Sequence, residues 1–237
     1  GSFFSVLKEM VISFVPTAPA LVPFYVDRYP CGNLSGISFQ DAEITVGPVR
    51  NRDALLLTHN CFSGPAILNL SRSARPGDLI AINYYPVKPE DMILKELSSS
   101  LPGNNKQVLT VLYEYFPEIP RRFLETICSR VGVDGAEKAS RLPISLLKAL
   151  VRLIVRDEYQ IQRLGGYESA MVTAGGVSLS EISTKTMESK KFPGLFFAGE
   201  VLDVDGDTGG YNLQFAFSSG FLAAQNCLAE KIGTEIS

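Results

Sequence analysis

Residues 194–214 read GLFFAGEVLDVDGDTGGYNLQ, and this stretch decides the fold of the C-terminal part of the chain. Residues 194–198 are short, apolar and bounded by glycines, which is typical of an interior strand of a parallel sheet. Residues 211–231 are apolar over much of the circumference of a predicted helix. Thr208, Gly209 and Gly210 then lie at the helix start, where unpaired N–H groups point outward and paired glycines let a polar ligand approach the backbone.

The composition is that of a globular protein with a substantial core. Of the 237 residues, 46% are hydrophobic and 20% are charged, which suits one large domain or two small ones. The formal net charge is −3, the sequence pI is about 5.3, and there is no Lys/Arg-rich run, so we do not expect nucleic acid as a partner. Prolines interrupt the apolar residues 11–26, so we expect no membrane span.

The four cysteines indicate neither a disulfide framework nor a zinc site. Cys31, Cys61, Cys128 and Cys227 are far apart in the sequence and form no C-x-x-C pair. This usage fits a reducing compartment, and no cleavable signal is visible. We therefore expect a cytoplasmic protein that holds no metal.

Turn residues divide the N-terminal part of the chain into short, alternating segments. Glycines and prolines separate predicted strands at 20–26, 37–46, 53–58 and 78–84, a pattern that favours a small antiparallel barrel. From Lys88 onward, the apolar residues recur at helical spacing. One helix is expected to begin at Pro89, and three more are expected at residues 105–115, 120–131 and 143–155. Two further strands are predicted at 159–164 and 167–173. The fold class is therefore α+β, a small antiparallel β-barrel with a helical subdomain.

Several stretches together resemble a known family of two-domain flavoproteins. They read AMVTAGGVSL at 170–179, KTMESK at 185–190 and PGLFFAGE at 193–200, with weaker similarity at 19–23 and 57–68. With the motif around Gly209 and Gly210, they are similar to the BaiN-like NAD(P)/FAD-dependent oxidoreductases, which include bacterial bile-acid enone reductases. The resemblance covers nearly the whole chain. It implies that a barrel-plus-helices insert interrupts a Rossmann-like FAD-binding domain.

The resemblance also implies a domain plan. We expect residues 1–12 to be a remnant of the FAD-binding domain and residues 173–237 to be its C-terminal segment. Residues 13–172 would be the insert, with the barrel at 13–87 and 156–172 and the helical subdomain at 88–155. The G-x-G-x-x-G turn that would open such a family member is absent from the sequence. We therefore expect the C-terminal part of a longer flavoprotein, whose strand at 194–198 and following helix need the missing half or self-association to cover them.

The resemblance implies which residues contact the flavin. Reduction places negative charge near N1 and the C2 carbonyl of the ring, so a helix N-terminus aimed there stabilises the reduced form. The expected cofactor-binding residues are Gly175, Gly176, Gly199, Glu200, Thr208, Gly209, Gly210, Tyr211, Asn212 and Leu213. An alternative is that the glycines only allow tight packing between strand and helix.

Other polar residues are candidates for separate chemistry. His59 is the only histidine, so it is a candidate for a substrate cavity, and any Ser-His-Asp or Cys-His hydrolase would have to use it. No nucleophile elbow surrounds it. Asp203, Asp205 and Asp207 have the spacing of a calcium loop, but Thr208 and Gln214 occupy the positions that need Gly and Glu. The sequence names no catalytic residue and predicts no metal ligand.

The expected function is therefore that of the C-terminal portion of an FAD-dependent oxidoreductase. The family resemblance implies FAD as the cofactor, NAD(P)H as a possible electron donor and a small organic molecule as the substrate. The alternative is a non-catalytic module that binds a ligand or partner and does not hold FAD by itself.

Overall fold

A computed structural model describes the backbone of residues 2–234 and the side chains of residues 5–228. The chain forms two compact units. Unit 1 comprises Gly1–Val22 and Gly165–Ser237, and unit 2 comprises Pro23–Leu164. Residues 1 and 235–237, which the expected domains include, lie outside the described residues.

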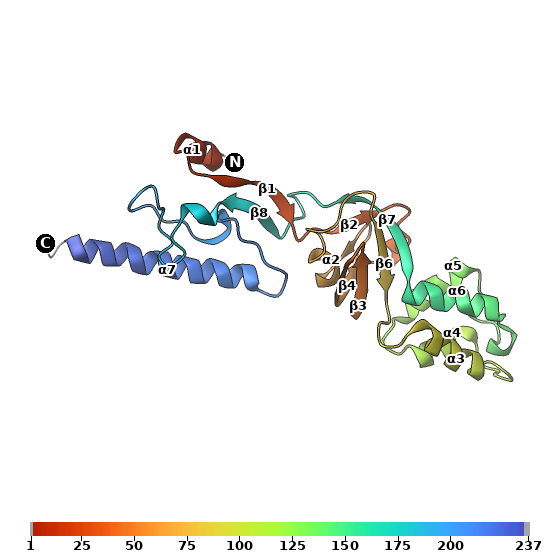
Figure 1. Ribbon diagram of the computed structural model, residues 1–237. Coiled ribbons are helices and arrows are strands. Elements are labelled where there is room, and N and C mark those ends of the chain that lie inside the picture. Colours follow the sequence, from red (N-terminus) through yellow and green to blue (C-terminus); the bar gives the residue numbers. More distant parts are fainter. Residues whose placement is uncertain (1, 235–237) are drawn as a thin grey trace. The chain divides into compact units, whose positions relative to one another are not determined.

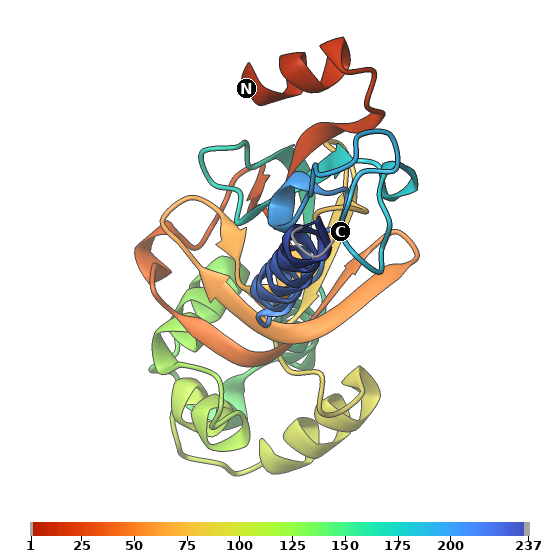
Figure 2. The same ribbon diagram turned by 90° about the vertical axis from the view of Figure 1, so that its left-hand side faces the viewer.

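Unit 2 is built on a closed antiparallel barrel of six strands, as the alternating pattern predicted. The strands follow the order β2-β5-β4-β3-β6-β7 around the barrel. In the long β3–β4 hairpin, orange in Figure 2, Val46 pairs with Val49 across the turn. Inward residues alternate with outward ones along β7, so apolar side chains fill the interior. The barrel strands are β2 (Phe24–Val26), β3 (Ser38–Val46), β4 (Val49–Leu57), β5 (Phe62–Ser63), β6 (Leu79–Asn83) and β7 (Asp157–Leu164).

Four helices between β6 and β7 form the helical cluster of unit 2 (Figure 1). Pro89, Pro120 and Pro143 each precede the first turn of one helix, where a missing N–H costs nothing. Gly132 ends one helix with a φ of 77°. The four predicted helices are thereby confirmed as α3 (Glu90–Ser100), α4 (Val108–Tyr115), α5 (Arg121–Val131) and α6 (Ile144–Val155). The unit also has a short helix α2 (Pro65–Leu68) and two 3₁₀ turns, η1 (Gly32–Leu34) and η2 (Ala139–Arg141).

The barrel and the helical cluster share one core. The ring of Phe123 on α5 lies 4.5 Å from that of Tyr84 and 4.9 Å from that of Phe39, measured between centroids. Beside these rings, Arg130 on α5 forms a two-pronged ion pair with the buried Asp157 on β7, at 2.6 and 2.8 Å. Apolar and ionic contacts thus fix α5 against the barrel.

Unit 1 joins segments from both ends of the chain. Strand β1 (Phe14–Ala20) pairs antiparallel with β8 (Val172–Val177) in a two-stranded sheet. Helix α1 (Ser2–Glu9) precedes this sheet, and the helix at the C-terminal end is α7 (Tyr211–Thr234). Between them lie two 3₁₀ turns, η3 (Leu179–Glu181) and η4 (Gly199–Val201). A small core holds these pieces together, and its fully buried members include Leu7, Val177 and Leu202.

Three expectations about unit 1 differ from the structure. Residues 194–198 were expected to form a strand, but they do not. Among the described residues, their backbone makes a single isolated β-bridge, between Phe196 and Glu188, instead of a ladder of hydrogen bonds. The segment predicted as a strand at 167–173 is largely turn, and the strand β8 begins at Val172. Unit 2 spans 23–164 rather than 13–172 because β1 and β8 pair with each other and not with the barrel.

Candidate functional site

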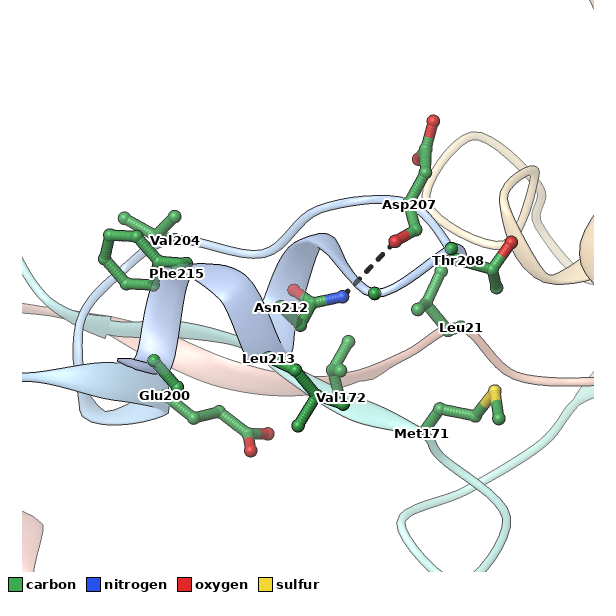
Figure 3. Close-up of a pocket in the computed structure, with 13 residues that line it drawn as sticks. Leu21, Met171, Val172, Glu200, Val204, Asp207, Thr208, Asn212, Leu213 and Phe215 are labelled. Atoms are coloured by element: carbon green, nitrogen blue, oxygen red, sulfur yellow. Dashed lines mark hydrogen bonds between the residues drawn. The ribbon is translucent and has the colours of Figure 1, made fainter. Parts of the chain in front are cut away.

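A cavity of about 360 Å³ lies in unit 1 beside the first turn of α7 (Figure 3). This volume falls in the range of small-molecule sites, which run from roughly 300 to 1,000 Å³. The walls come from the β1 end, from β8, from η4 and from the loop that precedes α7. The lining residues are Leu21, Met171, Val172, Glu200, Val204, Asp207, Thr208, Gly209, Gly210, Asn212, Leu213, Phe215 and Ala216.

Asn212 shapes the loop that forms one wall of the cavity. Its Nδ2 donates to the Gly206 carbonyl at 2.9 Å, and its Oδ1 accepts from the Gly206 N–H at 2.8 Å. A longer bond of 3.4 Å reaches the carbonyl of Asp207, as Figure 3 shows. A side chain in the first helical turn thus ties the preceding loop to the helix.

The paired glycines predicted at the helix start do line the cavity. Gly209 and Gly210 have φ angles of 109° and 93°, which side chains other than glycine rarely adopt. A Cβ on Gly210 would meet no other heavy atom within 4 Å, so this backbone faces open space. The helix then begins with a bond from the Gln214 N–H to the Gly210 carbonyl. The preceding N–H groups have no acceptor within the helix, and with the helix dipole they favour an anionic ligand.

Glu200 contributes a carboxylate to the opposite side of the cavity. Its Oε1 accepts from the Thr173 N–H of β8 at 2.5 Å, which orients the side chain along the cavity wall (Figure 3). The side chain of Glu200 is exposed, so its second oxygen is accessible to a ligand. A carboxylate accepts hydrogen bonds only, so this position suits a ligand hydroxyl.

Apolar side chains complete the walls. Leu21, Met171, Val172 and Leu213 face the cavity (Figure 3). Leu21 is buried and has a φ of 52°, a left-handed conformation that costs a branched side chain about 1 to 3 kcal/mol. Such strain is maintained by the surrounding packing and is common at ligand sites. An apolar wall opposite a polar helix start suits a flat heteroaromatic ring.

Gly175, Gly176 and Gly199 do not line this cavity. A Cβ on Gly175 would lie 2.4 Å from the Pro16 carbonyl oxygen, and one on Gly176 would lie 2.5 Å from that of Val201. These two glycines therefore permit the close approach of β8 to the β1 backbone and to the backbone of Val201 and Leu202. The Gly199 N–H donates to the buried Ser219 Oγ at 2.9 Å, which fixes η4 to α7.

Two other predicted site residues lie outside the cavity lining. Tyr211 is 66% exposed, and its ring edge would lie 3.5 Å from a Cβ on Gly209, so it flanks the glycine pair. His59 is in unit 2, exposed in the turn that follows β4. The neighbouring Thr58 hydroxyl holds that turn by donating to the Cys61 carbonyl at 2.8 Å.

Within the described residues, no group of His, Cys, Asp and Glu side chains is placed to hold a metal ion. The same part of the chain contains no helix that is both long and apolar enough to cross a bilayer.

Sequence reasoning predicted Leu213 at the cavity but missed the rest of its apolar wall. Leu21 and Met171 come from segments far apart in the sequence, and the pairing of β1 with β8 places both at the cavity. Both residues lie in stretches that resemble the family, PALVP and AMVTAGG. The family resemblance could therefore have indicated them, whereas the spacing of apolar residues could not. The residues present fit a flavin, because they combine a glycine-paired helix start, a carboxylate and an apolar wall.

Comparison with known proteins shows the family of the chain. The profile of the HI0933-like protein Rossmann domain matches residues 6–226. The chain is 32% identical to the ribosomal RNA dihydrouridine synthase of Escherichia coli, over 96% of this chain and 56% of that protein. It is 33% identical to the Haemophilus influenzae protein of the same name, over 93% of this chain and 54% of that protein. It is 26% identical to the 3-dehydro-bile acid delta(4,6)-reductase of Clostridium scindens, over 95% of this chain and 57% of that protein.

The chain thus spans little more than half the length of these curated relatives. Because the profile matches residues 6–226, the chain belongs to the HI0933-like Rossmann-domain family.

Proposed function

We propose that this chain is the C-terminal portion of an FAD-dependent oxidoreductase and that its cavity holds part of the flavin. The observation that carries the proposal is the joint placement of Gly209, Gly210, Asn212 and Glu200 around one cavity. FAD carries both a flat ring and a polyhydroxylated, phosphorylated chain, and the cavity offers a surface suited to each. Family membership supports the same conclusion.

The names of the relatives suggest a common type of reaction. Dihydrouridine differs from uridine by two hydrogens added across a ring double bond conjugated to a carbonyl. A 3-dehydro-delta(4,6) substrate also carries double bonds conjugated to a carbonyl. We therefore propose that the reaction is the reduction of a carbon–carbon double bond activated by a neighbouring carbonyl. The two relatives above 30% identity favour a uracil base in RNA as substrate over a small organic enone.

Different residues of the cavity would contact different parts of the cofactor. The N–H groups at the start of α7 would face the N1 and C2 carbonyl edge of the flavin and stabilise the negative charge of its reduced form. Glu200 would accept a bond from a ribityl hydroxyl. Asn212 positions the loop, and Leu21, Met171 and Val172 exclude water from the ring. When bound, the flavin would supply the hydride, after being reduced by NAD(P)H.

One face of α7 requires a covering partner in this scheme. Leu213, Phe217, Phe221 and Leu228 recur at spacings of four, four and seven positions, and each is between 61% and 75% exposed. They form a continuous apolar stripe on the helix. We propose that a nucleotide-binding half, such as the additional length of the relatives provides, packs on this stripe and completes the FAD site.

The proposal is tested by mixing the chain with a separate nucleotide-binding half, FAD and NAD(P)H under anaerobic conditions. Oxidation of NAD(P)H that depends on both protein parts and on a uridine-containing RNA or an enone is expected. Glu200→Gln should weaken FAD binding, whereas Glu188→Gln is a matched control because the Glu188 carboxylate accepts from the Gly194 N–H instead of lining the cavity.

The alternative function is that of a ligand- or partner-binding module that holds no FAD. It predicts that neither the chain nor the mixture acquires a flavin spectrum. The assay therefore separates the two functions.

A further inference from the structure

The charges of the chain are divided unevenly between the two units. Unit 2 carries 17 Lys and Arg against 15 Asp and Glu, a net charge of +2. Unit 1 carries five Lys and ten Asp and Glu, a net charge of −5, and the two values give the −3 of the whole chain. All twelve arginines lie in unit 2. We expected no nucleic-acid partner partly because the net charge of the whole chain is −3. That single value does not show the difference in charge between the two units.

Most of these arginines are engaged by neighbouring carboxylates. Seven form ion pairs with Asp or Glu. Among the others, Arg122 donates from Nη2 to the Asn33 carbonyl at 2.8 Å, and two further exposed arginines, Arg75 and Arg163, lie on or beside β7. Arg75 instead donates from Nη1 to the carbonyls of Arg72 and Ala74. The guanidinium of Arg163 lies over the ring of Tyr25, 3.4 Å from its centroid. Within the described part of the chain, neither guanidinium is paired with a carboxylate.

Arg75, Arg163 and Tyr25 are carried by adjoining segments of the barrel, and we call them the arginine surface. Tyr25 is opposite Arg163 in the β2–β7 ladder. The loop that carries Arg75 runs along the other edge of β7, because the Gly77 N–H donates to the Ile161 carbonyl at 2.7 Å. Two acidic side chains in these segments have other contacts: the Asp78 carboxylate accepts from the Arg75 backbone N–H, and the Asp27 carboxylate lies 3.8 Å from the Arg28 guanidinium.

This arrangement has the chemistry of a site for single-stranded RNA. A guanidinium presents a planar fork of N–H donors that binds two phosphate oxygens at once. Unpaired bases stack on aromatic rings and on guanidinium planes, and the Arg163–Tyr25 stack offers such a plane. We propose that the arginine surface of unit 2 binds a single-stranded stretch of RNA. This inference rests on the proposed function, since it assigns the RNA substrate class to that reaction.

The position of the surface in the chain suits this role. Tyr25 follows the cavity residue Leu21 by four positions, and Arg163 lies two positions before Gly165, where unit 1 resumes. The arginine surface therefore adjoins, along the chain, both connections to the unit that carries the cavity.

The test is the fluorescence anisotropy of a labelled, unstructured, uridine-containing RNA oligonucleotide titrated with the 237-residue chain. Changing Arg75 and Arg163 together to Gln should weaken binding about tenfold and lower the slope of log affinity against log salt by about 1.4, because two phosphate contacts are lost. The matched control changes Arg121 and Arg152 to Gln. These arginines pair with Glu125 and Glu90, so the same change in charge should leave affinity within about twofold.

A third variant separates charge from stacking. Arg163→Lys keeps the charge but loses the planar stack on Tyr25, so its affinity should fall between those of the wild type and the double variant. Equal loss of affinity in both double variants, or no RNA binding by the wild type, would overturn the inference. Flavin absorbance measured on the same samples distinguishes this failure from failure of the proposed function, because the arginine surface contains no residue of the cavity.

Discussion

Asn212 and Gly206 exchange two hydrogen bonds, one from the side-chain amide to the Gly206 carbonyl and one from the Gly206 N–H to the side-chain oxygen. This pair ties the loop to the helix that follows it. Asn212→Ala should weaken FAD binding about tenfold, since losing two bonds of this kind costs about 1.4 kcal/mol. Isothermal titration measures the change. Asn226→Ala is the control, because that amide bonds the Leu222 carbonyl within α7, and an equal loss in both variants would contradict the assigned role.

The glycines of unit 1 should separate into two classes on substitution. Gly176→Ala places a Cβ 2.5 Å from the Val201 oxygen, so it should lower the free energy of unfolding by about 3 kcal/mol or more. Gly210→Ala meets no atom within 4 Å and should cost only about 1 kcal/mol of backbone strain, while its methyl group obstructs the flavin. Urea unfolding and FAD titration of both variants measure the two effects. Similar stability losses without a difference in FAD affinity would refute this division.

The Arg130–Asp157 pair should govern the stability of unit 2. Asp157 is 1% exposed, and Asp157→Asn leaves the Arg130 guanidinium without its counter-charge. The variant should lose about 3 kcal/mol of unfolding free energy, at the lower end for a broken buried pair because Arg130 is partly exposed. Asp41→Asn breaks an exposed two-pronged pair with Arg52 and should cost less than about 1 kcal/mol. Chemical denaturation would argue against the assignment if the two variants lost equal stability.

Alkaline pH should destabilise unit 2 through its buried thiols and phenols. Burial raises the pKa of the Cys31 thiol to about 12 and that of Cys128 to about 11. Burial also raises the pKa of Tyr84 and Tyr159. A raised pKa in the folded state means that the unfolded chain releases its protons first, so stability is full below about pH 8.5 and falls as pH rises toward 12. Denaturation midpoints measured across this range would contradict the assignment if they stayed constant.

The same burial predicts which cysteines react. Iodoacetamide at pH 8 should label the exposed Cys227 and spare Cys31, Cys61 and Cys128. Peptide mass mapping of the native chain identifies the labelled positions, and rapid modification of Cys31 would contradict its placement in the core.

The barrel could be predicted from the sequence because its inward residues alternate, whereas the limits of some strands could not. Strand β4 was predicted to begin at Asp53, but it begins at Val49. Arg50 and Arg52 face solvent, so the first part of the strand lacks the apolar residues by which a strand is recognised in the sequence. The pairing of β1 with β8 joins distant segments that local patterns do not connect, so the insert expected from the family resemblance began at residue 13 and included β1. The glycine pair at 209–210 was readable because a turn before a helix is a local feature. Leu21 and Met171 meet at the cavity only through that long-range pairing.

The central claim, that the cavity beside α7 holds the flavin, is tested most directly by a visible spectrum. The 237-residue chain and its Gly210→Glu variant are each mixed with the separate nucleotide-binding half, incubated with excess FAD and desalted. We predict that the wild type retains flavin bands near about 370 and 450 nm and that the variant is colourless, because a carboxylate at the helix start fills the cavity and repels the anionic cofactor. A colourless wild type, or equal retention of flavin by both proteins, would contradict the claim.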